Sequence, residues 1–185
     1  QRAKDLNPES IMIFIPGGAQ PAALGKAFAE RGVDLKKTKV LGSGETTAEA
    51  ALKSMGDNAL GIITAWHYDY KMDNPLNREF VREFNAMHGR NPDFFSIGGY
   101  DGMHAIYETL KKTGGKTDAE TMIAAAKGLS WQSPRGTMSI DPETRDVVQS
   151  VYIRRVQKVG NELVNVPFDR IENVKDPAGE RRKKK

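Results

Sequence analysis

In the first third of the chain, short continuous runs of apolar residues alternate with segments in which apolar residues recur at helical spacing. The run Ile11–Ile15 is continuously apolar, as expected for a strand covered on both faces. A helix is predicted to follow it, with Pro21 in the first turn and Gly32 as the C-terminal cap. Further strands are predicted at 40–41 and 60–64, with another helix between them. Strands that alternate with helices through short links indicate a parallel sheet with right-handed crossovers.

Beyond residue 73 the apolar residues take helical spacing. Asn74 is expected to cap one helix, and a second is predicted over about 95–112. In a capping box, a hydroxyl and a carboxylate each accept a hydrogen bond from an exposed backbone N–H at a helix start. The spacing fits such boxes at two helix starts, at Thr46 with Glu49 and at Thr117 with Glu120.

The last part of the chain alternates apolar and polar residues in strand fashion. The pattern predicts strands at 137–140, 147–159 and 162–166, with turns at Asp141-Pro142 and Gly160-Asn161. Together with the parallel sheet, these strands indicate an α/β fold with a C-terminal β-hairpin.

Charge and composition exclude several classes of protein. The net charge is +4, but five cations lie at 181–185, so the rest of the chain is close to neutral. A nucleic-acid-binding protein would carry a basic stripe on its folded body, so no nucleic-acid partner is expected. No apolar run approaches the ~18 residues that a membrane span requires. The absence of cysteine excludes disulfides, thiolate metal sites and cysteine nucleophiles.

No motif with catalytic spacing stands out. The segment Gly42-Ser43-Gly44 has Thr47 where a dinucleotide fingerprint needs its third glycine, and it also fails the nucleophile-elbow pattern. His67 and Asp69 could contact one metal ion, but no partner set has the right spacing. The chain is therefore expected to have no catalytic residues, no metal site and no cofactor.

Several short segments carry a resemblance to a known family, and it is their order that makes it specific. They are Asp5-Leu6-Asn7-Pro8, Pro16-Gly17-Gly18, Glu30-Arg31-Gly32-Val33, Gly42-Ser43-Gly44, the run from Met55 to Thr64, Asn74-Pro75, Phe80-Val81, Gly99-Tyr100-Asp101-Gly102, Pro134-Arg135-Gly136 and Tyr152-Ile153. In this order they resemble the branched-chain amino-acid-binding family of type I periplasmic solute-binding proteins.

The resemblance implies two α/β lobes joined by three crossings, with a ligand held in the cleft between them. Family members are roughly twice as long as this chain, so the resemblance also implies a missing N-terminal half and a signal peptide upstream. The implied division is 1–70 as the second half of the distal lobe, 71–135 as helices of the first lobe, 136–176 as returning strands with the C-terminal segment, and 177–185 as a basic disordered tail.

Ligands of doubly wound sheets lie beyond the C-terminal ends of the strands, where two loops carry candidate residues. In the loop with Gly18, Ala19 and Gln20, small residues leave backbone N–H groups open to an anion at a helix N-terminus. In the next loop, Ser43 and Glu45 stand near the place where the family holds the ligand ammonium. The alternatives are an ordinary strand-to-helix turn and a solvated carboxylate that assists the following helix.

A third candidate is the aromatic segment Trp66, His67, Tyr68 and Tyr70, which suggests a ligand with a flat or aromatic portion. Its alternative is a hinge packed against the other lobe. From the helical part, Tyr100 and Asp101 are expected to border the cleft, with packing of Tyr100 as the alternative.

The function expected from these features is that of a periplasmic solute-binding component of an ABC transporter. It would bind an amino acid or a small carboxylate, aromatic ones included, and present it to the permease, without a cofactor. As a fragment it would associate with its missing half or form a homodimer. The alternatives are a sensory or regulatory domain of the same fold and an α/β hydrolase, for which a nucleophile and a base are wanting.

Overall fold

The computed structural model describes residues Gln1–Gly179, which fold into two compact units. Unit 1 comprises residues 1–66 and 152–170, and unit 2 comprises 67–151 together with the segment from Ile171 onward. The chain therefore passes between the units three times. The basic run 181–185 lies outside the described residues.

Unit 1 is built on a parallel sheet, as the alternation of strands and helices predicts. Its elements are α1 (Arg2–Asp5), β1 (Ser10–Ile13), α2 (Gln20–Glu30), β2 (Lys39–Ser43), the 3₁₀ turn η1 (Gly44–Thr47), α3 (Glu49–Met55), the 3₁₀ turn η2 (Gly56–Ala59) and β3 (Ile63–Trp66). β1 pairs parallel with β2, and β2 with β3. β6 (Val147–Val159) then adds antiparallel to β3, and β7 (Glu162–Val174) pairs with β6.

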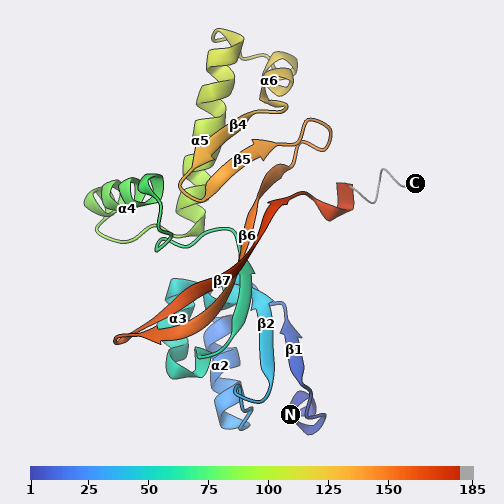
Figure 1. Cartoon of the computed structure of the whole chain (residues 1–185), viewed down its shortest axis with the longest axis vertical. Coiled ribbons are helices and arrows are strands. Elements are labelled where there is room, and N and C mark those ends of the chain that lie inside the picture. The colour runs from blue at the N-terminus through green and yellow to red at the C-terminus, as the bar shows by residue number, and fades with distance from the viewer. Residues whose placement is uncertain (180–185) are drawn as a thin grey trace. The chain divides into compact units, whose positions relative to one another are not determined.

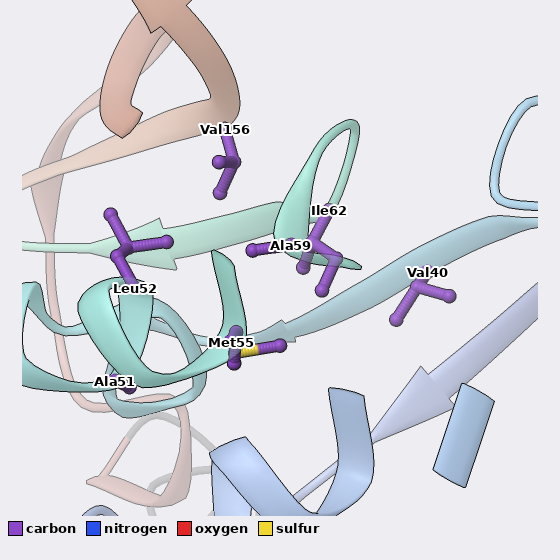
Figure 2. Packing of buried hydrophobic residues seen from close by; sticks show 7 residues of the cluster. All are labelled: Val40, Ala51, Leu52, Met55, Ala59, Ile62 and Val156. Carbon is purple, nitrogen blue, oxygen red and sulfur yellow. The ribbon is translucent and has the colours of Figure 1, made fainter. Parts of the chain in front are cut away.

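Helices cover one face of this sheet and enclose the core of unit 1. Figure 2 shows that core, which consists of Val40, Ala51, Leu52, Met55, Ala59, Ile62 and Val156. A Cβ on Gly25 of α2 would stand 3.1 Å from Met55 Cε, so a glycine lets α2 approach α3 closely.

The expectation that β1 is covered on both faces is wrong for the described residues. Ile11 and Ile13 pack against the core, whereas Met12 is 87% exposed and Phe14 is 89% exposed. Side chains of a strand alternate between faces, so helices on one side can bury only half of them.

Unit 2 is mainly helical. It contains α4 (Pro75–His88), α5 (Phe94–Thr113), α6 (Ala119–Ala126), β4 (Ser130–Ser133) and β5 (Gly136–Ile140) (Figure 1). β4 and β5 form an antiparallel hairpin, and β5 pairs with the first residues of β6. Leu129, Trp131 and Met138 form a small core from this hairpin.

The observed helix N-caps agree with the caps predicted from the sequence at one helix and differ at two. Asn74 caps α4, because its Oδ1 accepts from Asn77 N at 2.9 Å. The predicted capping box at Thr46 is absent, since α3 starts after Ala48 without a side-chain cap. The box at Thr117 is also wrong, because Asp118 caps α6 by accepting from Thr121 N.

The loop between β5 and β6 holds the C-terminal segment of unit 2. Asp141 Oδ1 accepts from Glu143 N and Thr144 N at 2.9 and 3.1 Å, and Asp141 Oδ2 lies 3.1 Å from Lys175 Nζ. The two backbone hydrogen bonds, followed by Lys175, hold the pKa of Asp141 well below its ordinary value of 3.8.

Substituting Asp141→Asn is expected to make the stability of the protein less sensitive to acid. A depressed folded-state pKa contributes stability that is present above the unfolded pKa and is lost as pH falls through the folded pKa. The stability gap between wild type and Asp141→Asn should therefore narrow as pH falls from 4 toward 2. Urea unfolding at several pH values measures this gap. Asp146→Asn in the same loop is the control, and an unchanged gap would contradict the assignment.

Candidate functional site

Three loops meet at one edge of the parallel sheet of unit 1. β1, β2 and β3 run in the same direction, so the segments that follow Ile13, Ser43 and Trp66 emerge at their common C-terminal edge. Gly17 N donates to Glu45 Oε2 at 2.8 Å, which joins the first loop to the second. The carboxylate predicted as a ligand group is therefore held in place by the neighbouring loop.

The third strand meets the second loop through an aromatic ring. A Cβ on Gly44 would stand 2.1 Å from Trp66 Cγ, so the indole lies directly on the backbone of η1. Any other residue at 44 would displace the indole, because a real Cβ never approaches a ring carbon this closely. Gly44 thus fixes the position of a flat, half-buried ring at the end of β3.

Gly18 and Ala19 lie between β1 and α2, and Gln20 is the first residue of α2. Gly18 has φ 89°, a conformation that favours glycine, and Ala19 is the N-cap of α2. Ala19 and Gln20 are exposed, and no side chain caps this end of the 11-residue helix. Backbone N–H groups and the positive end of the helix dipole therefore face the loop.

A layer of buried polar side chains supports the second loop. Thr47 Oγ1 lies 3.1 Å from Thr64 Oγ1, which also accepts from Arg154 Nη2 at 3.2 Å. Asn165 Nδ2 donates to the carbonyl of Thr47 at 2.7 Å and thereby ties β7 to η1. The sequence reasoning missed these residues, although an asparagine at an inward position of an alternating strand is a detectable signal.

Three buried polar atoms near the same loop have no hydrogen-bond partner among the described residues: Ser43 Oγ, Thr46 Oγ1 and Asn165 Oδ1. Ser43 is a predicted site residue at the C-terminal end of β2. Its hydroxyl can therefore accept or donate one further hydrogen bond.

The aromatic segment after β3 does not form one exposed surface. Trp66 belongs to unit 1, whereas Tyr68 is 3% exposed in the core of unit 2, with its ring 6.4 Å from that of Phe80. Tyr68 Oη donates to Asn77 Oδ1 at 3.0 Å. Asn77 Nδ2 also donates to the carbonyls of Tyr70 and Met72, so this buried amide fixes the whole segment. His67 is half-buried beside it.

Tyr100 and Asp101 both lie within α5 and have different surroundings. Tyr100 is 44% exposed, and its ring lies 4.9 Å from that of Phe80. Burial, and then the charges of Asp101, Glu79 and Glu83, raise the pKa of Tyr100 above its ordinary value of 10.0.

Asp101 is 3% exposed and is the centre of a buried network. It accepts from Arg135 Nε at 2.6 Å, Ser133 Oγ at 3.0 Å and Trp131 Nε1 at 3.1 Å. These partners belong to the β4–β5 hairpin and its turn, so the carboxylate fastens the hairpin to α5. The structure thus gives Asp101 a structural position, where a ligand contact was expected.

Residues 1–179 contain no group of three or more potential metal-ligating side chains. Among the helices of this part, none is long and apolar enough to cross a membrane.

Comparison with known proteins finds relatives that match most of this chain. A family model described as periplasmic binding protein matches residues 1–161. A Leu/Ile/Val-binding protein homolog 6 from Brucella melitensis is 42% identical over 161 residues, which cover 85% of this chain. This chain spans only 41% of that relative's length.

Solved structures are similar over nearly the whole chain. A solute-binding protein of an ABC transporter from Rhodopseudomonas palustris BisB5, in complex with 3,4-dihydroxybenzoic acid, is 48% identical with a TM-score of 0.87. One from Rhodopseudomonas palustris HaA2, in complex with p-hydroxybenzoic acid, is 34% identical with a TM-score of 0.88. Both matches cover 96% of this chain, but 48% and 49% of those proteins.

Removing the Asp101 carboxylate is expected to destabilise unit 2. Asp101→Ala leaves the buried Arg135 guanidinium without this partner, which costs about 3–5 kcal/mol. Chemical denaturation monitored by Trp131 fluorescence measures the loss. Glu108→Ala on the same helix removes an exposed pair with Lys111 and should cost less than about 1 kcal/mol. Equal effects of the two substitutions would contradict the structural role of Asp101.

Proposed function

This chain belongs to the periplasmic binding protein family, and we propose that it supplies part of a receptor that delivers a small carboxylate to an ABC permease. The receptor would act in the periplasm as a binding protein without a catalytic step. Support comes from the relatives, which are solute-binding proteins of ABC transporters. The observation that carries the proposal is the loop cluster of unit 1, in which Glu45 is anchored on Gly17 and the Trp66 ring lies on Gly44.

Each part of this cluster suits one part of a small ligand. The exposed N–H groups around Gly18 and Ala19 at the start of α2 suit a carboxylate, because the helix dipole favours an anion there. The Glu45 carboxylate is acceptor-only when ionised, so it suits a hydroxyl or an ammonium group of the ligand. The Trp66 indole offers an apolar face to a flat ring or an aliphatic side chain.

The ligand class that fits best is an aromatic acid with a second polar substituent. Two relatives are in complex with hydroxylated benzoic acids, whose hydroxyl groups can donate to a carboxylate in the position of Glu45. An amino acid is the second candidate, because its ammonium group could pair with the same carboxylate. The Leu/Ile/Val-binding relative supports this candidate.

The complete receptor would need more chain than these residues. The relatives are about twice as long as the part this chain matches. We therefore propose that the chain works together with a polypeptide that corresponds to the remaining half. A homodimer of the chain is the alternative partner.

Completing the receptor is expected to create a ligand-binding protein. The test joins this chain to the part of the BisB5 relative that it does not cover and follows thermal unfolding with 4-hydroxybenzoate, benzoate and leucine. A ligand at a hundred times its Kd adds about 2.7 kcal/mol of stability. An aromatic acid should shift the transition most. If no carboxylate or amino acid shifts it, the proposed function is wrong.

Trp66→Ala should weaken binding of the aromatic acid. Loss of a ring contact worth about 1–2 kcal/mol corresponds to roughly a 5- to 30-fold rise in Kd. Titration calorimetry on the completed receptor measures the change. Phe168→Ala removes a half-exposed ring on β7 and serves as the matched control. If both variants bind the aromatic acid with the Kd of the wild type, the proposed contact between Trp66 and the ligand is wrong.

Glu45→Gln should weaken the binding of ligands that carry a hydroxyl donor more than the binding of ligands without one. The amide oxygen can still accept from Gly17 N, so the loop should be retained, but the charged acceptor is lost. Binding of 4-hydroxybenzoate should weaken severalfold more than binding of benzoate, which has no hydroxyl donor. Equal changes for the two acids would show that Glu45 does not contact the hydroxyl.

A further inference from the structure

Three segments that are far apart in the sequence meet at the turn between β4 and β5. This turn consists of Pro134 and Arg135, and the hairpin pairs Ser133 with Gly136 on either side of it. The hairpin lies beside α5 (Figure 1), where Asp101 accepts from Arg135 Nε at 2.6 Å. The Arg135 side chain is 9% exposed and that of Asp101 is 4% exposed. A buried, charge-assisted hydrogen bond therefore fixes the turn on α5.

A carbonyl of this turn holds the segment that follows the first crossing from unit 1 to unit 2, at 66–67. Asn74 Nδ2 donates to the carbonyl of Pro134 at 2.9 Å. The buried amide of Asn77 fixes the residues just before it, because it forms hydrogen bonds with three residues of the segment 68–72. Asn74 thus joins this ordered segment to the hairpin.

The guanidinium of the same turn holds the strand that returns to unit 1 at the second crossing, 151–152. β6 pairs with β5 at Val147 and Val148 and with β3 from Tyr152 onward. Gln149 lies between these two pairings, and its Oε1 accepts from Arg135 Nη1 at 2.9 Å. One arginine therefore connects the buried carboxylate of α5 with the strand that makes the second crossing.

We propose that the β4–β5 turn holds the unit 2 ends of the first and second crossings, and that Arg135 is thereby a positioning residue for ligand binding that acts without contacting the ligand. The proposal rests on the proposed function, because it assumes a receptor that closes on its ligand. During such a closure, the few residues that connect two units absorb the change in φ and ψ.

The expected effect on affinity follows from conformational entropy. Hydrogen bonds that order the chain next to the crossings reduce the freedom that ligand binding has to remove. Without them, the ligand itself would have to order these segments, and its Kd would rise. The rise should be the same for every ligand, because the turn does not select among ligands.

Two substitutions each remove one of these hydrogen bonds and keep the buried ion pair. Asn74→Asp retains an oxygen that can cap α4, because aspartate is as good an N-cap as asparagine, but it loses the donor to Pro134. Gln149→Met is of similar length and lacks the carbonyl acceptor for Arg135. Gln132→Met is the matched control, since Gln132 is exposed on β4 and forms its hydrogen bonds within the hairpin.

Hydrogen exchange of the full chain without ligand, followed by mass spectrometry, tests whether the turn holds the two crossings. Asn74→Asp should raise the exchange rate of amides in 67–73 at least about threefold, and Gln149→Met that of amides in 147–151. Gln132→Met should leave both segments unchanged. Unchanged exchange in either segment, or an equal rise in the control, would overturn the proposal.

Titration of the completed receptor with 4-hydroxybenzoate and with benzoate tests the effect on binding. Asn74→Asp and Gln149→Met should each raise the Kd of both acids by the same factor, about three- to fivefold. Unchanged Kd values, or factors that differ between the acids, would overturn the positioning role. A receptor that binds neither acid contradicts the proposed function alone, since the exchange measurement needs no ligand and still decides whether the turn holds the crossings.

Discussion

Parallel pairing of β1, β2 and β3 is the constraint on which the candidate site depends. It brings the ends of three strands to one edge, although Gly17 and Glu45 are 28 residues apart in the chain. The short hydrogen bond between them and the indole on Gly44 then turn three separate loops into one surface. The buried layer of Thr47, Thr64 and Asn165 supports this surface from within the sheet.

A second constraint acts in unit 2, where polar groups are buried and apolar groups are exposed. Asp101 receives three hydrogen bonds from the β4–β5 hairpin and its turn, so protein donors compensate its burial. In unit 1, Met12 on β1 and Phe14 just beyond this strand are exposed apolar side chains.

The local sequence pattern was enough to predict those helices and strands for which residue periodicity and the turn or capping residues indicate the same boundaries. The 147–159 strand coincides with β6, because a segment rich in β-branched residues is followed by the turn Gly160-Asn161. Asn74 before Pro75 also gives an unambiguous helix start. The two predicted capping boxes are wrong for different reasons. Asp118, next to Thr117, caps α6 instead. Thr46 lies inside η1, so it does not stand at the start of α3. β4 was missed because its four residues include one large apolar side chain.

The candidate site was predictable in place but not in detail. The rule that ligands lie beyond parallel strands led to Gly18, Ser43 and Glu45 at one edge. The roles of Tyr68 and Asp101 depend on partners distant in sequence, such as Arg135, which is 34 residues from Asp101. The periodicity of a sequence does not indicate contacts between distant residues. A buried aspartate and an aspartate in a ligand-binding cleft therefore cannot be distinguished from the sequence pattern.

The most direct test of the central claim is a ¹H–¹⁵N correlation spectrum of the completed receptor, titrated with 4-hydroxybenzoate. If the loop cluster of unit 1 binds the ligand, the amide signals of Gly17 and Gly18 and the indole signal of Trp66 should shift and saturate together. If the ligand binds while these three signals stay unchanged, the site lies elsewhere and the assignment of the loop cluster is wrong.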